Sequence, residues 1–262
     1  MAGLSSHFAS YSQWLHTRWP AGTVEKLPEC DEHGRTNVPG IRIVGDLTGI
    51  PLLKFSADTG ARAVREIAVE LTNPQSAIRN PQSIDLAIIG AGVSGIAAAM
   101  EAKKAGLNFV LYEATQIFST VANFPKGKPI YTYPTEMTPA GDLQFHANVK
   151  EALLDEMEAQ RRVAGIEPVP ARIERLEKTG DEITLHHADK TTTKARRVIV
   201  AIGRSGNFRK LGCRGEDLPK VYNRLHDPKD YTGKNVLVVG GGDTALETAI
   251  ALGACGAHVT LS

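Results

Sequence analysis

The sequence has few cysteines, and those it has are too far apart to form a recognisable pair. Cys30, Cys213 and Cys255 are odd in number, and no C-x-x-C occurs. This excludes a framework of closely spaced disulfides and a C-x-x-C redox motif. Cys30 stands near His33, but no second pair of ligands completes a metal site. We therefore interpret this stretch as a solvated loop and expect no metal.

The sequence also lacks an excess of one charge and any long apolar run. Its formal net charge is +1, so nothing in the bulk charge favours nucleic acid or an anionic membrane. No apolar run is long enough to span a bilayer. The N-terminal MAGLSSHFAS has no basic region followed by an apolar one, as a secretory signal would. We expect a cytoplasmic protein without a membrane segment or a nucleic-acid partner.

What is present is typical of a soluble globular protein. The chain has 262 residues, 42% of them hydrophobic and 23% charged, which suits one large or two ordinary domains. Residues 8–18 carry aromatic and leucine side chains at helical spacing, and residues 58–71 have the pattern of an amphipathic helix. Between positions 73 and 83, NPQSAIRNPQS contains the tetrapeptide NPQS twice. This low-complexity stretch predicts a linker that separates residues 1–72 from the rest.

The pattern changes at Ile84. Residues 84–113 predict a strand, a glycine turn, a helix that stops at Gly106, and a second strand. Residues 141–161 predict another helix. Residues 171–200 predict three short strands, with turns at positions 179–181 and 188–190. We expect residues 84–206 to form one domain.

The turn in the first of these units has the spacing of a dinucleotide-binding loop. Gly90 permits the tight turn, Gly92 lets the backbone approach a pyrophosphate, and Gly95 lets the helix pack close to the strand. The helix N-terminus offers unpaired N–H groups to the phosphates. Glu113 ends the next strand, where a carboxylate accepts hydrogen bonds from ribose hydroxyls. Strand, loop, helix and acid together predict a dinucleotide site.

A second loop of the same kind follows near the C-terminus, again between a strand and a helix. Its expected nucleotide-binding residues are Gly240, Gly242, Asp243, Thr244 and Ala245. The residues that choose between NAD and NADP normally follow the next strand, which here ends at Ser262. The sequence therefore leaves that choice open, and we expect residues 207–262 to form a partial nicotinamide-nucleotide domain.

The order of these elements resembles the thioredoxin-reductase-like branch of the pyridine nucleotide disulfide oxidoreductases. The likeness runs from residue 84 to 262, and it implies two Rossmann-like domains in an α/β fold. In that family the first loop binds FAD and the second binds NAD(P)H. Gly203, at the end of a Val-Ile-Val-Ala-Ile-Gly strand, would lie near FAD by this resemblance. Arg172 would offer backbone contacts to the adenine.

An earlier segment belongs to the same resemblance but stands in an unexpected place. Thr36–Ile41 followed by Gly45-Asp46 is similar to a T-x-x-P-G-I…G-D signature that closes the FAD domain near its C-terminus in the family. There the aspartate accepts a hydrogen bond from a ribityl hydroxyl. Residues 41–44 look like a strand buried on both faces. Either residues 1–72 dock onto the FAD domain as a circularly permuted piece, or they are the remnant of an upstream module.

The electron path beyond the flavin is less well defined. Thioredoxin reductases carry C-x-x-C just before the second loop, where this chain has VYNRLHDPKDYTGK, so disulfide exchange by that route is excluded. Residues 118–137 resemble the flavin-facing segment of bacillithiol disulfide reductase-like proteins. Those have a cysteine in the first loop where this chain has Ser94. Asn123 and Lys128 are candidates for the flavin surroundings, although a solvated lysine would also fit.

These observations predict an FAD-dependent NAD(P)H oxidoreductase. A hydride would pass from the nicotinamide to the flavin, and electrons would go on to a small molecule or a redox protein. Disulfide, quinone, ferredoxin and partner domain all stay open as acceptors, as does a homodimer. The alternative is a non-catalytic nucleotide-binding or redox-sensing module, or an inactive fragment. We assign no catalytic side chain.

Overall fold

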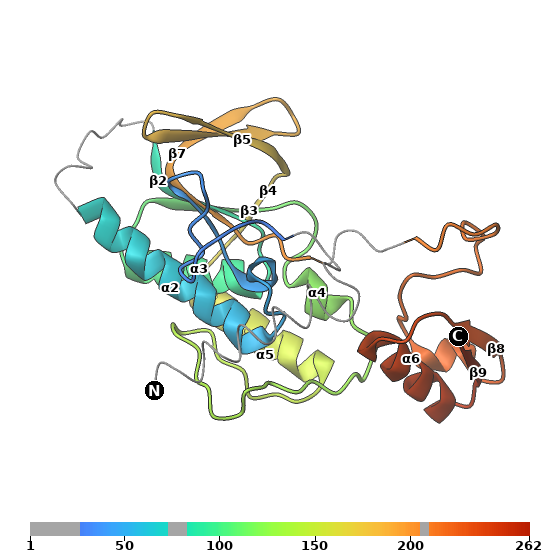
Figure 1. Cartoon of the computed structure of the whole chain (residues 1–262). Coiled ribbons are helices and arrows are strands. Elements are labelled where there is room, and N and C mark those ends of the chain that lie inside the picture. The colour runs from blue at the N-terminus through green and yellow to red at the C-terminus, as the bar shows by residue number, and fades with distance from the viewer. Residues whose placement is uncertain (1–26, 73–82, 205–209) are drawn as a thin grey trace.

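The described part of the chain is built around one mixed sheet. The computed structural model describes residues 27–72, 83–204 and 210–262 (Figure 1). The main sheet contains β1 (Ile41–Ile43), β2 (Ile84–Ile89), β3 (Phe109–Glu113), β4 (Val169–Pro170), β5 (Ile173–Thr179), β6 (Glu182–His187) and β7 (Thr192–Val200). Their order is β4-β3-β2-β7-β6-β5, and β1 pairs with β7 beside this path. The predicted α/β class is confirmed.

Helices cover one face of the parallel strands, and a β-meander covers the other. The helices are η1 (Gly45–Thr48), α2 (Leu53–Thr72), α3 (Val93–Lys104), α4 (Ser119–Ala122) and α5 (Lys150–Val163). In the larger core, Ile88 of β2 joins Ile96 of α3 and Met157 of α5. On the opposite face, Ile89 belongs to a second core with Leu185 of β6. Strands buried on both faces need apolar side chains in both directions, as β2 has. Figure 1 shows the meander at the top and the helices below it.

Strand β7 has two different partners along one edge. Its first half pairs antiparallel with β6, from His186 opposite Thr192 to Ile183 opposite Ala195. Its last three residues pair parallel with β1, with Ile43 opposite Val200. The other edge of β7 pairs parallel with β2. The N-terminal strand therefore lies in the same sheet as β2 and runs parallel to it.

Helix α2 packs next to this N-terminal strand and holds it in the sheet partly through ion pairs. The expectation that residues 41–44 are buried on both faces is confirmed, although the strand includes a charged residue, Arg42, of whose side chain only 3% is exposed. The Arg42 guanidinium binds Glu66 and Glu70 of α2, each at 2.5 Å. A buried charge requires such partners. Arg197 of β7 also binds Glu70, at 3.2 Å.

Helix α5 begins later than the expected helix at residues 141–161. Residues 143–148 have no regular secondary structure, and the helix starts at Lys150. Longer-range contacts hold this stretch outside the helix: the Ile130 N–H donates to the Asn148 carbonyl, and the Glu156 carboxylate accepts from the His146 N–H. Backbone groups satisfied in this way gain nothing from joining the helix.

The last described stretch, residues 210–262, forms a separate small unit that we call the second unit. It contains η3 (Pro228–Tyr231), β8 (Asn235–Val238), α6 (Asp243–Ala254) and β9 (His258–Leu261). Strands β8 and β9 form a parallel two-stranded sheet beside α6, as the predicted strand–loop–helix–strand pattern requires. Several apolar side chains of this unit remain exposed, among them Leu237, Val239, Ile250 and Leu261. Figure 1 shows the unit, in orange and red, with α6, β8 and β9 to the right of α4 and α5.

In the first unit, by which we mean the described residues before the second unit, the two strands predicted within residues 84–113 are β2 and β3, and the three predicted within residues 171–200 are β5, β6 and β7. The predicted turns at positions 179–181 and 188–190 are also present. The expected amphipathic helix at residues 58–71 lies within α2. The expected helix at residues 8–18, and residues 73–82 of the expected linker, lie outside the described residues. Among the helices that the structure describes, none is long and apolar enough to cross a membrane.

Candidate functional site

A large cavity opens at the carboxyl ends of β2, β3 and β7. Its volume is about 990 Å³, and its walls come from the first glycine loop, the N-terminal segment and the end of β7. Ligands of open parallel sheets bind at this end of the strands. Eight of the residues singled out from the sequence line it: Asp46, Gly90, Gly92, Ser94, Glu113, Lys128, Arg172 and Gly203. The structure thus brings together residues from widely separated parts of the chain.

Each glycine of the first loop is required for a different structural reason. Gly90 has φ +101°, and a β-carbon there would lie 2.6 Å from the Ala201 carbonyl oxygen. A β-carbon at Gly95 would overlap the Gly90 carbonyl, so this glycine lets α3 pack against the turn. Gly92 is the opposite case, because a β-carbon there would meet no described atom within 4 Å. The open side of Gly92 belongs to the cavity wall, and it leaves the backbone accessible to a ligand.

Glu113, at the end of β3, is hydrogen-bonded to this loop. Its Oε2 accepts a hydrogen bond from the Ala91 N–H at 2.7 Å, and its Oε1 accepts from the Thr115 N–H at 2.8 Å. The carboxylate is thereby fixed at the cavity wall, next to the turn at Gly90. Each carboxylate oxygen has more than one lone pair, so Glu113 keeps capacity to accept from a hydroxyl group of a ligand.

Asp46 lies in the same cavity, although it comes from the N-terminal segment. Its Oδ1 accepts a hydrogen bond from the Ser56 hydroxyl at 2.9 Å. Burial raises the pKa of Asp46, against the opposing effects of the Ser56 hydrogen bond and the Arg204 charge. A partly buried carboxylate beside a cavity is a group whose ionised form gains from a further hydrogen-bond donor.

The remaining predicted residues of the first unit differ in position. Asn123 does not belong to the cavity lining, because its side-chain amide donates to the Ser119 carbonyl at 2.7 Å and closes α4. Arg172 lines the cavity, and its carbonyl accepts from the Ala188 N–H. Lys128 also lines it, with its ammonium 4.6 Å from the centre of the Phe124 ring. Phe124 and Tyr131 are further lining residues on the same loop.

The second glycine loop stands at the start of α6, as predicted. Gly242 is the N-cap of α6, and the Gly240 N–H donates to the Ser262 carbonyl at 2.7 Å. The residues of this loop from Gly241 to Thr244 are exposed. Asp243 and Thr244 form the first turn of the helix, and Ala245 lies near Gly240, whose β-carbon would be 3.6 Å from the Ala245 β-carbon.

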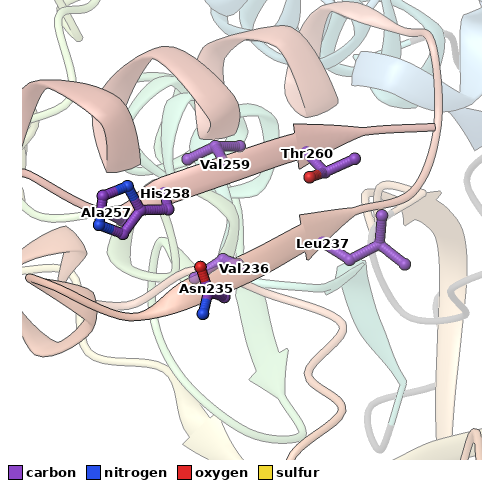
Figure 2. A pocket seen from close by; sticks show the side chains of 7 residues that line it. All are labelled: Asn235, Val236, Leu237, Ala257, His258, Val259 and Thr260. Atoms are coloured by element: carbon purple, nitrogen blue, oxygen red, sulfur yellow. The ribbon is translucent and has the colours of Figure 1, made fainter.

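A shallow hollow of about 590 Å³ runs along β8 and β9, away from the glycine loop. Figure 2 shows its lining side chains, which lie on the two strands or, for Ala257, just before β9: Asn235, Val236, Leu237, Ala257, His258, Val259 and Thr260. This hollow has no carboxylate and no glycine turn, so we assign no cofactor to it. The residues that the structure describes contain no group of three His, Cys, Asp or Glu side chains that could hold a metal ion.

Comparison with known proteins identifies the family. Residues 87–262 match the family described as pyridine nucleotide-disulphide oxidoreductase. The chain belongs to this family. The resemblance predicted from the sequence is thereby confirmed. Proteins of this family use FAD and NAD(P)H.

Individual relatives agree with this assignment. The chain is 33% identical to a ferredoxin–NADP reductase of Ignicoccus hospitalis, over 68% of this chain and 55% of that protein. It is 33% identical to a thioredoxin reductase of Mycoplasma genitalium, over 64% and 50%. Among solved structures, bacillithiol disulfide reductase Bdr (YpdA) from Bacillus cereus aligns with a TM-score of 0.61 at 25% identity, over 69% of this chain and 58% of that one. The chain spans about half the length of the curated relatives it matches.

Some lining residues were not found from the sequence. Ser56 supports Asp46 from α2, and Glu247 reaches the cavity from α6. Neither belongs to a motif, and each meets its partner only through the packing of separate elements. Phe124 lies inside the stretch identified by resemblance, but no local pattern marks it as a wall of the cavity.

Proposed function

We propose that the protein binds FAD in the large cavity and NAD(P)H at the second glycine loop, and that it oxidises NAD(P)H. Bound FAD supplies the ability to accept a hydride and release electrons singly or in pairs. The observation that carries the proposal is the joint lining of one cavity by Gly90 and Gly92 of the first loop, Glu113 and Asp46. A family match over residues 87–262 supports it.

The residues present fit FAD. The open side of Gly92 and the N-terminus of α3 suit a pyrophosphate, because unpaired N–H groups and the helix dipole favour negative charge there. Glu113 suits the ribose hydroxyls of the adenosine half. Asp46 suits a ribityl hydroxyl, and its carboxylate would accept that hydrogen bond. The cavity is partly open to solvent, and its volume of about 990 Å³ is large enough for an extended dinucleotide.

We further propose that residues 1–72 are a permuted part of the FAD domain, which otherwise comprises residues 84–206. The pairing of β1 with β7 and the ion pairs from Arg42 to α2 support this view. A remnant of an upstream module would have no reason to contribute Asp46 to the cavity wall. Residues 207–262 would be the partial nicotinamide-nucleotide domain, joined to it after β7.

We propose a small molecule or a redox protein as the electron acceptor. The relatives' names include ferredoxin and thioredoxin as partners of those proteins. This chain lacks the C-x-x-C through which a dithiol would be reduced. Electron delivery from the flavin without a dithiol relay, as to a ferredoxin or quinone, therefore fits the residues better.

The absorbance spectrum of the purified chain tests the proposal. The visible absorbance bands of oxidised flavin should be present or should appear when FAD is added. Anaerobic addition of NADPH or NADH should then bleach them. A chain that never takes up FAD contradicts the proposal. A chain that holds FAD but is bleached by neither nucleotide supports instead the non-catalytic module.

A further inference from the structure

The loop that walls the FAD cavity carries a lysine that reaches across to the second unit. The Lys128 ammonium lies 2.5 Å from the Oε2 of Glu247, and it also lies over the Phe124 ring. Lys128, Glu247 and Phe124 all line the large cavity. The Lys128 side chain is 20% exposed and that of Glu247 50%, so the pair lies at the cavity mouth and is partly shielded from water.

A second link joins the same loop to the second unit. The Lys126 ammonium binds the Asp227 carboxylate at 2.9 Å, and the Lys126 N–H donates to the His226 carbonyl at 2.9 Å. Asp227 is the N-cap of η3, which packs against α6. Lys126 and Lys128 thus hold the second unit at two points, one near η3 and one on α6.

Glu247 is well placed to fix the second glycine loop. It lies in the second turn of α6, and the N-cap of that helix is Gly242. A helix turn is short and stiff, so fixing Glu247 also fixes the direction in which the loop faces. The elements of the second unit, η3 included, pack mainly on one another. The polar links from Lys126 and Lys128 therefore contribute much of the orientation of the second unit relative to the first.

We propose that Lys128 and Glu247 are positioning residues that orient the second glycine loop toward the FAD cavity. The inference rests on the proposed function, since it concerns the approach of one nucleotide site to the other. An ion pair at this exposure is weak, so it favours one orientation without locking it. The ion pair allows the second unit to change its orientation reversibly, and it raises the fraction of time in which the two nucleotide sites face each other.

The test reverses each charge separately and then both together. Lys128→Glu and Glu247→Lys should each slow the bleaching of bound flavin by saturating NADPH by about two- to fivefold, the range expected for a partly exposed pair. The double variant, K128E with E247K, should recover most of the rate. In about 1 M salt, where charges are screened beyond a few ångströms, the wild-type and single variants should converge.

The control pair is Lys104 and Asp142, an ion pair of 2.9 Å within the first unit that lies away from the cavity lining. Lys104→Glu applies the same charge change as Lys128→Glu and should leave the bleaching rate unchanged. Flavin content is measured for every variant, and rates are compared per bound flavin. Glu247→Lys is the decisive single variant, because it leaves the loop of Lys128 intact.

A readout without nucleotides separates this inference from the proposed function. In small-angle X-ray scattering at low salt, each single reversal should increase the radius of gyration, and the double reversal should restore it. If flavin never binds but the scattering behaves in this way, the proposed function fails and the positioning contact stands. If Glu247→Lys changes neither readout, or the double reversal rescues neither, the positioning role is wrong.

Discussion

Gly45 and Ser94 lie so close together that a β-carbon at residue 45 would be 2.7 Å from the Ser94 hydroxyl oxygen. Ser94 is in the first turn of α3, and Gly45 follows β1. The N-terminal segment therefore fits directly against the helix start that follows the first glycine loop. A β-carbon at Gly60 of α2 would likewise overlap the Ser94 carbonyl, so two glycines permit this approach.

Replacing Gly45 tests this approach. Gly45→Ala should lower the free energy of unfolding by about 1–3 kcal/mol, because the residue has φ +70° and the new methyl group would meet Ser94. Flavin content should fall with it. Gly180→Ala is the control, with φ +59° and no described atom near its β-carbon. Equal losses in the two variants, measured by urea unfolding, would show that only backbone strain matters.

Gly92→Val should remove bound flavin while leaving the fold intact. The valine side chain would enter the cavity where the backbone is open, and its β-carbon would meet no described atom within 4 Å. The control is Gly241→Val in the second loop, where a β-carbon also meets open space. That variant should keep its flavin. Full flavin occupancy in the Gly92 variant, measured by absorbance, would contradict the assignment of the first loop.

Asp46 should make flavin binding depend on pH. Burial raises the pKa of this carboxyl, so the ionised form is costly in the empty cavity and gains from a ribityl donor. Flavin affinity should therefore fall as the pH drops through this raised pKa. Asp46→Ala should weaken binding by about 1.5–3 kcal/mol at neutral pH and should flatten the dependence.

The stability of the empty protein should respond in the opposite sense. A raised pKa means that Asp46 favours the folded state at pH values below the ordinary aspartate range and that this contribution is lost as the pH rises through the folded-state value. Without FAD, the stability of Asp46→Ala relative to the wild type should therefore be greater at neutral pH than at acid pH. Asp155→Ala, at an exposed position on α5, is the control for both measurements. Titration calorimetry with FAD and thermal unfolding provide the data, and a pH-independent affinity in the wild type would count against Asp46 as a ligand.

Glu66→Gln should destabilise the attachment of β1 to α2. The variant loses a charged partner of the buried Arg42, and we expect a loss of about 1–3 kcal/mol in the free energy of unfolding. Burial alone would raise the pKa of Glu66, but hydrogen bonds from Arg42 and His33 outweigh it and the pKa is lowered. A lowered pKa gives stability above the ordinary glutamate range, which is lost as the pH falls through the folded-state value. The difference between wild type and variant should therefore shrink at acid pH, whereas Glu174→Gln, at an exposed site, should show no difference at any pH.

The exposed apolar side chains of the second unit predict association at high concentration. Leu237 of β8 is 61% exposed and Ile250 of α6 is 72% exposed, and both strands of the small sheet have open edges. Leu237→Glu should reduce the association constant measured by analytical ultracentrifugation. Val163→Glu makes the same kind of change at a 91% exposed position on α5 and should not. A wild-type chain that stays monomeric at high concentration would contradict this expectation.

The parts of the fold that were predictable are those with local signals. In the first unit, the glycine spacing, the apolar strand before it and Glu113 after it together identified β2, α3 and β3. Each signal lies within one β-α-β stretch, so no distant contact was needed to interpret it. The hairpin turns of the meander were found for the same reason.

The parts that were missed depend on contacts between distant residues. The start of α5 is set by Ile130 and Glu156, whose hydrogen bonds hold the preceding residues outside the helix. Arg42 breaks an apolar pattern, and only its ion pairs with α2 explain how the strand is buried nonetheless. Periodicity carries no information about such partners. For the same reason Asp46 could be placed by resemblance, while its support by Ser56 could not.

The pairing of β1 with β7 has a consequence for the order of events during synthesis. Residues 41–43 leave the ribosome on the order of ten seconds before residues 198–200 are made, at ordinary translation rates. Until then, the strand and the apolar face of α2 have no sheet to join, and contacts so distant in sequence form slowly. The first described segment to be made is therefore among the last to be fixed, and in a cell a chaperone has that interval in which to bind it.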